Sequence, residues 1–457
     1  MKRLPIAFVA VLCWACGPRS RMVEGGRYGR QIKIIEPSGP ARGIVIFFSD
    51  RNGLTAADDA AAKELTDAGV LVAEVDTPAY LRELDKLKES CHQPAFDAEW
   101  FSREFQRERS FPKYLTPILA GVGEGATLVA MTLAYAPAAT IAGVVSVNPS
   151  STVAGSQPIC STANIERRGE GFHYDAPKNL PGFWFVALAH DASAESRNYV
   201  TELQHEGAPF EIHELAGDQS MSDVLRVIIE PQLASRQAYV TDISALPLTV
   251  LGVAHPSNLM AIVISGDGGW RDLDKTIAED LQQQGVPVVG WDSLRYFWSK
   301  KTPRQIADDL ATVMRTYMSK WHASEVALIG YSFGADVMPF AYNRLPADLR
   351  AHVKLLALLG FSKSADFQIT VTGWLGEPPG PEALPVLPEA DKIPSALMQC
   401  FYGQDEGDSD CPDLAKRGVQ VIRTTGGHHF DGNYDALADD IMRRLAAASP
   451  HASEAAP

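Results

Sequence analysis

One order of sequence patterns occurs twice in this chain, at an offset of roughly 210 residues. Each copy has a buried apolar run, a helical stretch and a second apolar run that begins with Gly-Val and ends with Asp. The matching runs are Gly43–Asp50 with Met260–Asp267, and Gly69–Asp76 with Gly285–Asp292. Buried runs that alternate with helices are typical of parallel sheets with helices on both faces. A repeat of this length indicates duplicated domains rather than solenoid units.

The two copies define the predicted domain organisation. A chain of 457 residues is long enough for two or three domains. We predict one α/β domain over residues 28–230 and a second over residues 240–446. Residues 447–457 are rich in Ala, Ser and Pro, which predicts a disordered tail.

A glycine-rich turn in the second copy indicates the kind of α/β domain. The apolar run Val326–Ile329 leads into Gly330-Tyr-Ser-Phe-Gly334, and a helical pattern follows. This context is that of the nucleophile elbow of α/β-hydrolases, in which a serine hydroxyl projects from the top of the sheet. Ser332 is therefore the candidate nucleophile, and we predict two tandem α/β-hydrolase-like domains. A glycine turn without activity is the alternative interpretation.

The first copy has the turn without the nucleophile. Its matching segment is Gly121-Val-Gly-Glu-Gly125, so Gly123 stands where the second copy has Ser332. The segment Glu214–Asp218, which matches the later histidine turn, contains no histidine. We therefore predict that the first domain is inactive and serves packing, substrate access or partner binding.

An acidic loop follows the apolar run 396–402 of the second copy. In α/β-hydrolases the chain order is serine, acid, histidine, so the acid is expected after such a run. Glu406 is the first choice by its spacing, and Asp405 and Asp408 remain open. A solvated loop or a cation site is the alternative interpretation of this cluster.

The next apolar run, 418–423, leads to a turn with two histidines. A Gly-His turn after the last core strand is where the general base of this fold belongs. His428 is the first choice for the base and His429 is the alternative. The histidine that is not used would be structural.

The glycine-rich loop Ser265–Trp270 is predicted to help bind the oxyanion. Such a site needs two backbone N–H groups, for which we expect Phe333 and the Asp267–Gly268 region. Asp267 and Trp270 are also candidates to receive a substrate ammonium group, through charge and cation–π contact. Packing in the core or rim is the alternative for each. The loop lacks Gly-Lys-Ser/Thr, so no P-loop is predicted.

Composition narrows the class of partner and cofactor. The formal net charge of −15 argues against direct nucleic-acid binding. Four cysteines lie beyond the N-terminal segment, and their spacings match no zinc pattern, so we predict no metal and no cofactor. Cys400 with Cys411 and Cys91 with Cys160 are the disulfide pairings that we favour.

The N-terminus resembles a targeting segment. Lys2 and Arg3 precede the mostly apolar run Leu4–Ala15, which is too short for a confident membrane span. We predict a secretory signal over residues 1–20 and a periplasmic protein. Cys16 is a candidate for lipid attachment and membrane anchoring, although the residues before it fit a lipobox poorly.

The chain resembles the bacterial virulence protein family VirJ and its longer two-domain form, AcvB. The resemblance lies in Ile264–Trp270, in Gly330–Phe340 and in Gly426–Phe430, and it is strong over the second domain only. It implies a periplasmic serine hydrolase of aminoacylated phosphatidylglycerol, notably lysyl-phosphatidylglycerol, at a membrane surface. Ser332 would be its nucleophile and His428 its base.

The same resemblance leaves room for other functions. Members of the family have been linked to secretion and DNA-transfer machinery, so a non-catalytic binding or assembly factor is one alternative. A hydrolase of another ester or a thioester is the other.

Overall fold

The computed structural model describes residues 19–448, apart from 138, 179, 191, 216–218, 235–242, 244–245 and 370–379. Most of the predicted signal segment, with Cys16, and most of the predicted tail lie outside the described residues. The chain divides into two compact units. The first takes the chain up to Ala98 with 115–135 and 141–235, and the second takes 99–114, 136–140 and everything from 236 onward. The sequence did not predict that residues 99–114 and 136–140 group with the second unit.

The second unit contains a seven-stranded sheet with one antiparallel edge strand. In spatial order its strands are β12 (Leu248–Leu251), β14 (Val288–Trp291), β13 (Leu259–Ile264), β15 (Glu325–Tyr331), β16 (Val353–Leu359), β19 (Met398–Gly403) and β20 (Gln420–Thr424). From β14 to β20 all neighbours are parallel. The carboxyl ends of these strands therefore meet at one edge, where ligands bind in open α/β sheets.

The first unit repeats this sheet. Its order is β1 (Arg19–Val23), β2 (Ile32–Glu36), β4 (Val70–Val75), β3 (Gly43–Phe48), β5 (Ile118–Val122), β6 (Gly143–Val147), β10 (Phe183–Leu188) and β11 (Glu211–Glu214). Without the extra strand β1, the order and the directions are those of the second unit. A small sheet of β7 (Val153–Ala154), β9 (Gly171–Tyr174) and β8 (Ile165–Arg168) is added.

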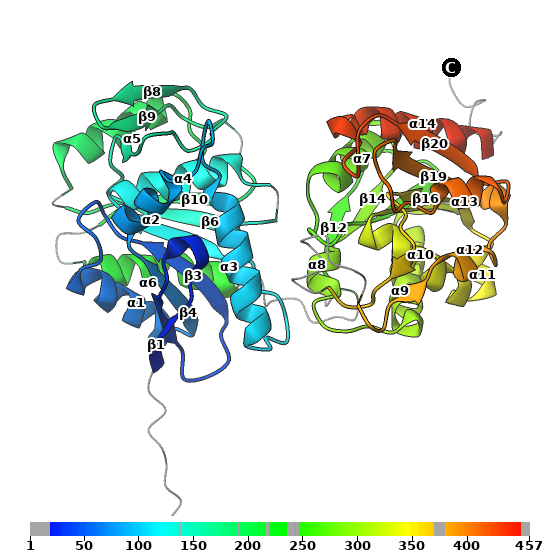
Figure 1. Cartoon of the computed structure of the whole chain (residues 1–457), viewed down its shortest axis with the longest axis horizontal. Helices are drawn as coiled ribbons and strands as arrows, with labels where there is room; N and C mark the ends of the chain where they lie inside the picture. Colours follow the sequence, from blue (N-terminus) through cyan, green and yellow to red (C-terminus); the bar gives the residue numbers. More distant parts are fainter. Residues whose placement is uncertain are drawn as a thin grey trace, which may run out of the picture. The chain divides into compact units, whose positions relative to one another are not determined.

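Helices cover both faces of each large sheet, as Figure 1 shows. In the second unit, α7 (Asp272–Gln283) and α14 (Tyr434–Ala448) pack on one face, and α9 (Pro303–Trp321) and α10 (Phe333–Arg344) on the other. The remaining helices are α1 (Ala56–Asp67), α2 (Thr77–Leu84), α3 (Pro94–Glu108), α4 (Glu124–Tyr135), α5 (Ala194–His205), α6 (Met221–Ala234), α8 (Ser293–Tyr296), α11 (Ala347–Arg350), α12 (Leu387–Ala390) and α13 (Cys411–Ala415). The predicted α/β class, with mostly parallel sheets and helices on both faces, is confirmed.

The central strands β15 and β16 explain why their sequences read as continuous apolar runs. Both are covered on two faces, and nearly all of their residues are buried. A strand of this kind cannot alternate polar and apolar residues, because both of its faces lie in a core. The edge strand β12 is by contrast partly exposed.

The two units also match in the hydrogen bonds that join the carboxyl ends of two neighbouring strands, β3 with β4 and β13 with β14. In the first unit the Ser49 hydroxyl accepts from the N–H of Thr77 at 3.0 Å, and the Thr77 hydroxyl donates to the Ser49 carbonyl at 2.6 Å. Ser265 and Ser293 make the same two bonds at 3.0 and 2.6 Å in the second unit. These pairs fix the start of the loop that follows β3 or β13.

Two disulfides stabilise the loops of the two units. Cys91 pairs with Cys160 in the first unit, and Cys400 pairs with Cys411 in the second, so both predicted pairings are confirmed. Among the helices of the described residues, none has the length and hydropathy needed to cross a bilayer.

Candidate active site

Ser332 lies on a strained turn between β15 and α10. Its φ is +51° and its ψ is −119°, a conformation that a residue with a side chain rarely adopts. The turn can form because glycines flank it. A Cβ at Gly330 would lie 2.6 Å from backbone atoms of Gly334, and a Cβ at Gly334 would lie 2.2 Å from the carbonyl of Ile264. The strain is a feature of nucleophile elbows, where it exposes the hydroxyl.

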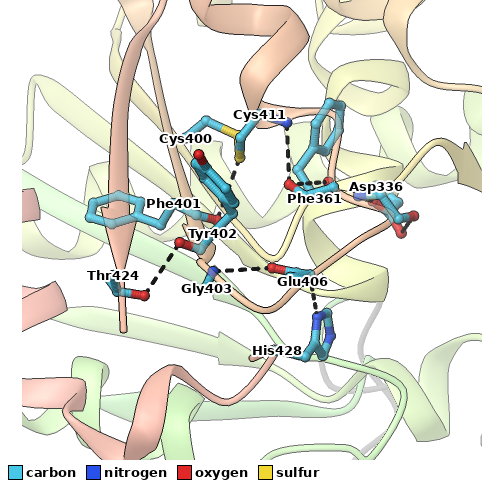
Figure 2. Close-up of a disulfide and its surroundings, with 12 residues drawn as sticks. Asp336, Phe361, Cys400, Phe401, Tyr402, Gly403, Glu406, Cys411, Thr424 and His428 are labelled. Carbon is cyan, nitrogen blue, oxygen red and sulfur yellow. Dashed lines mark hydrogen bonds and ion pairs between the residues drawn. A yellow bond between two sulfur atoms is a disulfide. The ribbon is translucent and has the colours of Figure 1, made fainter. Parts of the chain in front are cut away.

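A continuous chain of polar contacts connects Ser332 to a carboxylate. The Ser332 hydroxyl oxygen lies 2.8 Å from Nε2 of His428, and Nδ1 of His428 lies 2.5 Å from Oε1 of Glu406. Figure 2 shows Glu406 directed at this imidazole. The three residues come from three loops at the carboxyl edge of the sheet, after β15, β19 and β20.

The acid loop brings Glu406, rather than its acidic neighbours, to the imidazole. The loop turns tightly, with the Glu406 N–H donating to the Gly403 carbonyl at 3.0 Å and the Gly403 N–H lying 3.3 Å from Oε2 of Glu406. The Glu406 side chain is 4% exposed, whereas Asp405 and Asp408 are exposed. The Cys400–Cys411 disulfide closes this loop from β19 to α13.

The second histidine has a different partner. Nδ1 of His429 lies 3.0 Å from the hydroxyl of Tyr331, which also lies 3.3 Å from the carbonyl of His428. Tyr331 precedes Ser332 and was not singled out by the sequence. Its hydroxyl fastens the histidine turn to the nucleophile strand, so His429 supports the turn that carries His428.

The surrounding charges shift the pKa values of the two imidazoles in opposite directions. Burial alone would lower the pKa of His428, but the hydrogen bond and charge of Glu406, with the charges of Asp336 and Asp267, raise it above its ordinary value. The pKa of His429 is lowered by burial and by the charge of His428. A carboxylate at Nδ1 also favours the imidazolium that forms when Nε2 takes a proton.

The residues predicted to bind the oxyanion lie at the start of α10 and in the loop after β13. The Phe333 N–H is at the first position of the helix, where amides have no acceptor within the helix. The loop approaches Ser332 closely at Gly266, where a Cβ would lie 3.5 Å from Cβ of Ser332. The predicted residues Asp267 and Gly268 follow directly. Gly266, which the sequence did not single out, gives the loop its close approach.

The two residues predicted to contact substrate differ in their surroundings. Asp267 is partly exposed and interacts electrostatically with both His428 and His429. Trp270 is 7% exposed and packs in the core against Gly290, where a Cβ would lie 2.3 Å from its ring. The structure therefore places Asp267 near the two histidines and the Trp270 side chain in the core, which corrects the prediction for Trp270 from substrate contact to packing.

The equivalent position in the first unit is filled. A Cβ at Gly123 would lie 2.0 Å from a carboxylate oxygen of Asp50. That oxygen accepts a hydrogen bond of 2.8 Å from the N–H of Glu124, the counterpart of Phe333. The first unit thus has no hydroxyl at position 123. The N–H of Glu124, which corresponds to the predicted oxyanion donor Phe333, already donates to the carboxylate of Asp50.

No arrangement suited to a metal ion occurs among the described residues. In that part of the chain no three His, Cys, Asp or Glu side chains are grouped so that they could hold a metal ion.

Comparisons with known proteins show a family to which the second unit is similar. The family described as "Bacterial virulence protein (VirJ)" matches residues 258–449. A search of curated proteins found no match. Solved structures matched include the Francisella virulence factor BioJ (10% identity, 48% of this chain, 85% of that chain, TM-score 0.34), an arylesterase (17%, 48%, 84%, 0.32) and a Pyrobaculum calidifontis esterase (14%, 49%, 86%, 0.32). At these identities and TM-scores the structures add no argument about function. Residues 258–449, the part of this chain that holds Ser332, Glu406 and His428, are therefore similar to the bacterial virulence protein VirJ family.

Proposed function

We propose that the second unit is a serine hydrolase that cleaves the aminoacyl ester of aminoacyl-phosphatidylglycerol, with lysyl-phosphatidylglycerol as the first candidate. One observation carries the reaction class. The Ser332 hydroxyl, the His428 imidazole and the Glu406 carboxylate form one hydrogen-bonded chain at the carboxyl edge of the sheet.

The residues have the following roles in this proposal. His428 Nε2 takes the proton of Ser332 as its oxygen attacks the ester carbonyl, and Glu406 stabilises the imidazolium. The oxyanion binds the Phe333 N–H and the loop that begins at Gly266. His428 then protonates the departing glycerol oxygen of the lipid. Water, deprotonated by the same imidazole, attacks the acyl-enzyme and releases the amino acid.

The substrate is supported by the family and by charge at the site. The resemblance to VirJ and AcvB proteins suggested an aminoacyl lipid, and the matched family covers the domain that holds Ser332. The Asp267 carboxylate, near both histidines, is a suitable partner for an ammonium group next to the scissile ester. With the predicted signal segment, this suggests a periplasmic enzyme at a membrane surface, anchored there if Cys16 is lipidated.

The test uses purified full-length protein and vesicles that contain lysyl-phosphatidylglycerol. Wild-type protein is expected to release lysine and phosphatidylglycerol, and Ser332→Ala is expected to lose roughly a thousandfold or more of kcat/KM. Ser299→Ala, at an exposed serine of the same unit, is the matched control and should match wild type. Full lysine release by Ser332→Ala would refute the proposal.

Two further measurements separate the alternatives. A panel with alanyl-phosphatidylglycerol, a simple aryl ester and a thioester, compared by kcat/KM, tests the substrate class independently of the reaction class. A fluorophosphonate should label Ser332, with the modification located by mass spectrometry. Absence of labelling in folded protein would favour a non-catalytic binding or secretion-associated factor.

A further inference from the structure

Asp336 is a buried carboxylate that the steps above do not use. It lies in α10, one helical turn after Ser332, and is 8% exposed. Its two oxygens accept hydrogen bonds from Ser362, at 2.9 Å from the N–H and at 2.7 Å from the hydroxyl. It also interacts electrostatically with His428 and Glu406, the pair drawn with it in Figure 2.

Ser362 ends a segment, residues 360–362, that follows β16 and packs against the imidazole. Gly360 has a φ of +63° and lies so near His428 that a Cβ would be 2.7 Å from Cε1 of the ring. Through Ser362, Asp336 therefore holds the 360–362 segment in place against the imidazole of His428.

The same segment also holds the acid loop. The carbonyl of Phe361 accepts from the N–H of Asp410 at 2.9 Å and from the hydroxyl of Ser409 at 3.1 Å. Both donors lie at the end of the loop that carries Glu406. One short segment thus connects α10, the acid loop and the base.

In the first unit an uncharged side chain connects the helix after the elbow to the segment that follows the next strand. Thr127 lies one turn after Gly123, as Asp336 lies one turn after Ser332, and its hydroxyl donates to the carbonyl of Ser150 at 2.5 Å. Ser150 follows β6 as Ser362 follows β16. Where the imidazole is absent, Asn148 takes the place of Gly360 and has a φ of +46°.

We infer that Asp336 is a positioning residue with an electrostatic role: it anchors the 360–362 segment against His428 and, as a second carboxylate behind Glu406, stabilises the imidazolium of His428. This inference rests on the proposed serine-hydrolase function and deepens it. Asp336 would join the hydrogen-bonded Ser332–His428–Glu406 group as a fourth residue, and it would act only through His428.

The cost of burying Asp336 supports a role beyond anchoring. Burial of an ionised carboxylate is unfavourable, and a neutral threonine makes the corresponding connection in the first unit. Burial raises the pKa of Asp336 to about 7, against the hydrogen bonds from Ser362 and the charge of His428, which lower it. The groups that face His428 are Glu406 from the acid loop, Asp336 from α10, Asp267 from the loop after β13, Tyr331 from β15 and its neighbour His429.

The test removes the charge of Asp336 and keeps its hydrogen bonds. In Asp336→Asn the side-chain oxygen can accept from the Ser362 N–H, and its NH2 group can donate to the Ser362 hydroxyl. That hydroxyl then donates to the Ser364 carbonyl, 3.1 Å away. Asp336→Thr copies the first unit and serves as the second variant. Asp413→Asn, at a partly exposed carboxylate of α13, controls for net charge.

The readout is the pKa of His428, followed by NMR of the labelled imidazole in the full chain. Removal of a carboxylate that raises this pKa should lower it by about 0.5 units or more in both Asp336 variants and leave it in place in Asp413→Asn. The rate of fluorophosphonate labelling of Ser332 should fall about tenfold at its plateau, and its acid limb should move to lower pH. Tm at pH 8 should rise by a few degrees in Asp336→Asn, because a buried charge is gone.

The outcomes distinguish this inference from the function on which it depends. The electrostatic role is refuted if the His428 pKa is unchanged in folded Asp336→Asn or Asp336→Thr and labelling follows wild type at every pH. Asp336 would then only hold the 360–362 segment in place. If the wild type is not labelled at all, the proposed function fails, while the NMR titration still decides whether Asp336 acts on His428.

Discussion

At the scale of single residues, the chemistry depends on the charges around one imidazole. In the proposed reaction His428 must be neutral to accept the proton of Ser332, and its pKa is raised by Glu406, Asp336 and Asp267 despite burial. Activity and electrostatic stability therefore have opposite pH dependence. A raised histidine pKa stabilises the fold below the unfolded pKa of the imidazole, and this stabilisation is lost as pH rises through the folded pKa.

The pH profile follows from this shift. We expect kcat/KM for ester hydrolysis to fall tenfold per pH unit on the acid side, with a midpoint above the ordinary histidine value of about 6.5. Asp267→Asn should move the midpoint to lower pH, because one of the charges that raise the pKa is gone. Steady-state kinetics between pH 5 and 9 checks both, and a midpoint near 5 would contradict the assignment of His428 as base.

The choice of acid is tested by comparing neighbours. Glu406→Gln should lower kcat by roughly a hundredfold to ten-thousandfold, because the imidazolium loses its carboxylate and the ring its fixed orientation. Asp405→Asn and Asp408→Asn, which alter exposed groups of the same loop, should stay within about twofold of wild type. A larger loss at Asp405 than at Glu406 would reassign the acid.

At the scale of elements, the site is three loops after neighbouring parallel strands, and the acid loop is the one closed by a disulfide. The Cys400–Cys411 bridge connects the middle of β19 to the start of α13, and both cysteines are fully buried. Glu406 lies inside the closed loop. The position of the acid thus depends on a bond that only an oxidising compartment maintains.

The two disulfides provide a matched comparison. Replacing Cys400 and Cys411 together by alanine should destabilise the chain by about 3 kcal/mol and also lower kcat, because the loop with Glu406 loses its closure. Replacing Cys91 and Cys160 together should cost stability in the first unit and leave the chemistry at Ser332 unchanged. Urea unfolding and ester hydrolysis measure the two effects. Equal kcat in both double variants would show that closure does not position Glu406.

The sequence predicted the elements better than the contacts between them. Gly330, Ser332 and Gly334 reveal the elbow because the strain of this turn admits few other residues. The choice of Glu406 over Asp405 depends on the three-dimensional path of a tight turn, which spacing describes only approximately. The position of Trp270 could not be predicted, because the space for its ring is left by Gly290 on the neighbouring strand.

At the scale of the whole molecule, one fold is present twice and only the second copy has a hydroxyl at the elbow. The strand order is the same in both units apart from β1, and the Ser49–Thr77 bonds recur at Ser265–Ser293. The sequence predicted this duplication from apolar runs alone. It did not predict Asp50 beside Gly123, since the two are distant in the chain and meet only at the end of neighbouring strands.

A single restored serine should not activate the first unit. In Gly123→Ser the new side chain would collide with Asp50, and the Glu124 N–H would still be occupied. We expect the Gly123→Ser/Ser332→Ala variant to show no fluorophosphonate labelling by intact-mass analysis and to be less stable than Ser332→Ala. A label on the serine introduced at position 123 would show that the first unit retains a usable base and amide.

The carboxylate of Asp50 limits how the first unit could gain activity. The elbow of this unit has no reactive side chain, and the space that such a side chain would need is filled, so a gain of activity requires at least two changes together. A serine at position 123 alone would collide with the carboxylate of Asp50, and removal of that carboxylate alone would leave the unit without a nucleophile. Neither change by itself therefore brings a catalytic gain. Under the proposed function the reaction is therefore confined to the second unit, and the first unit is free to serve other roles.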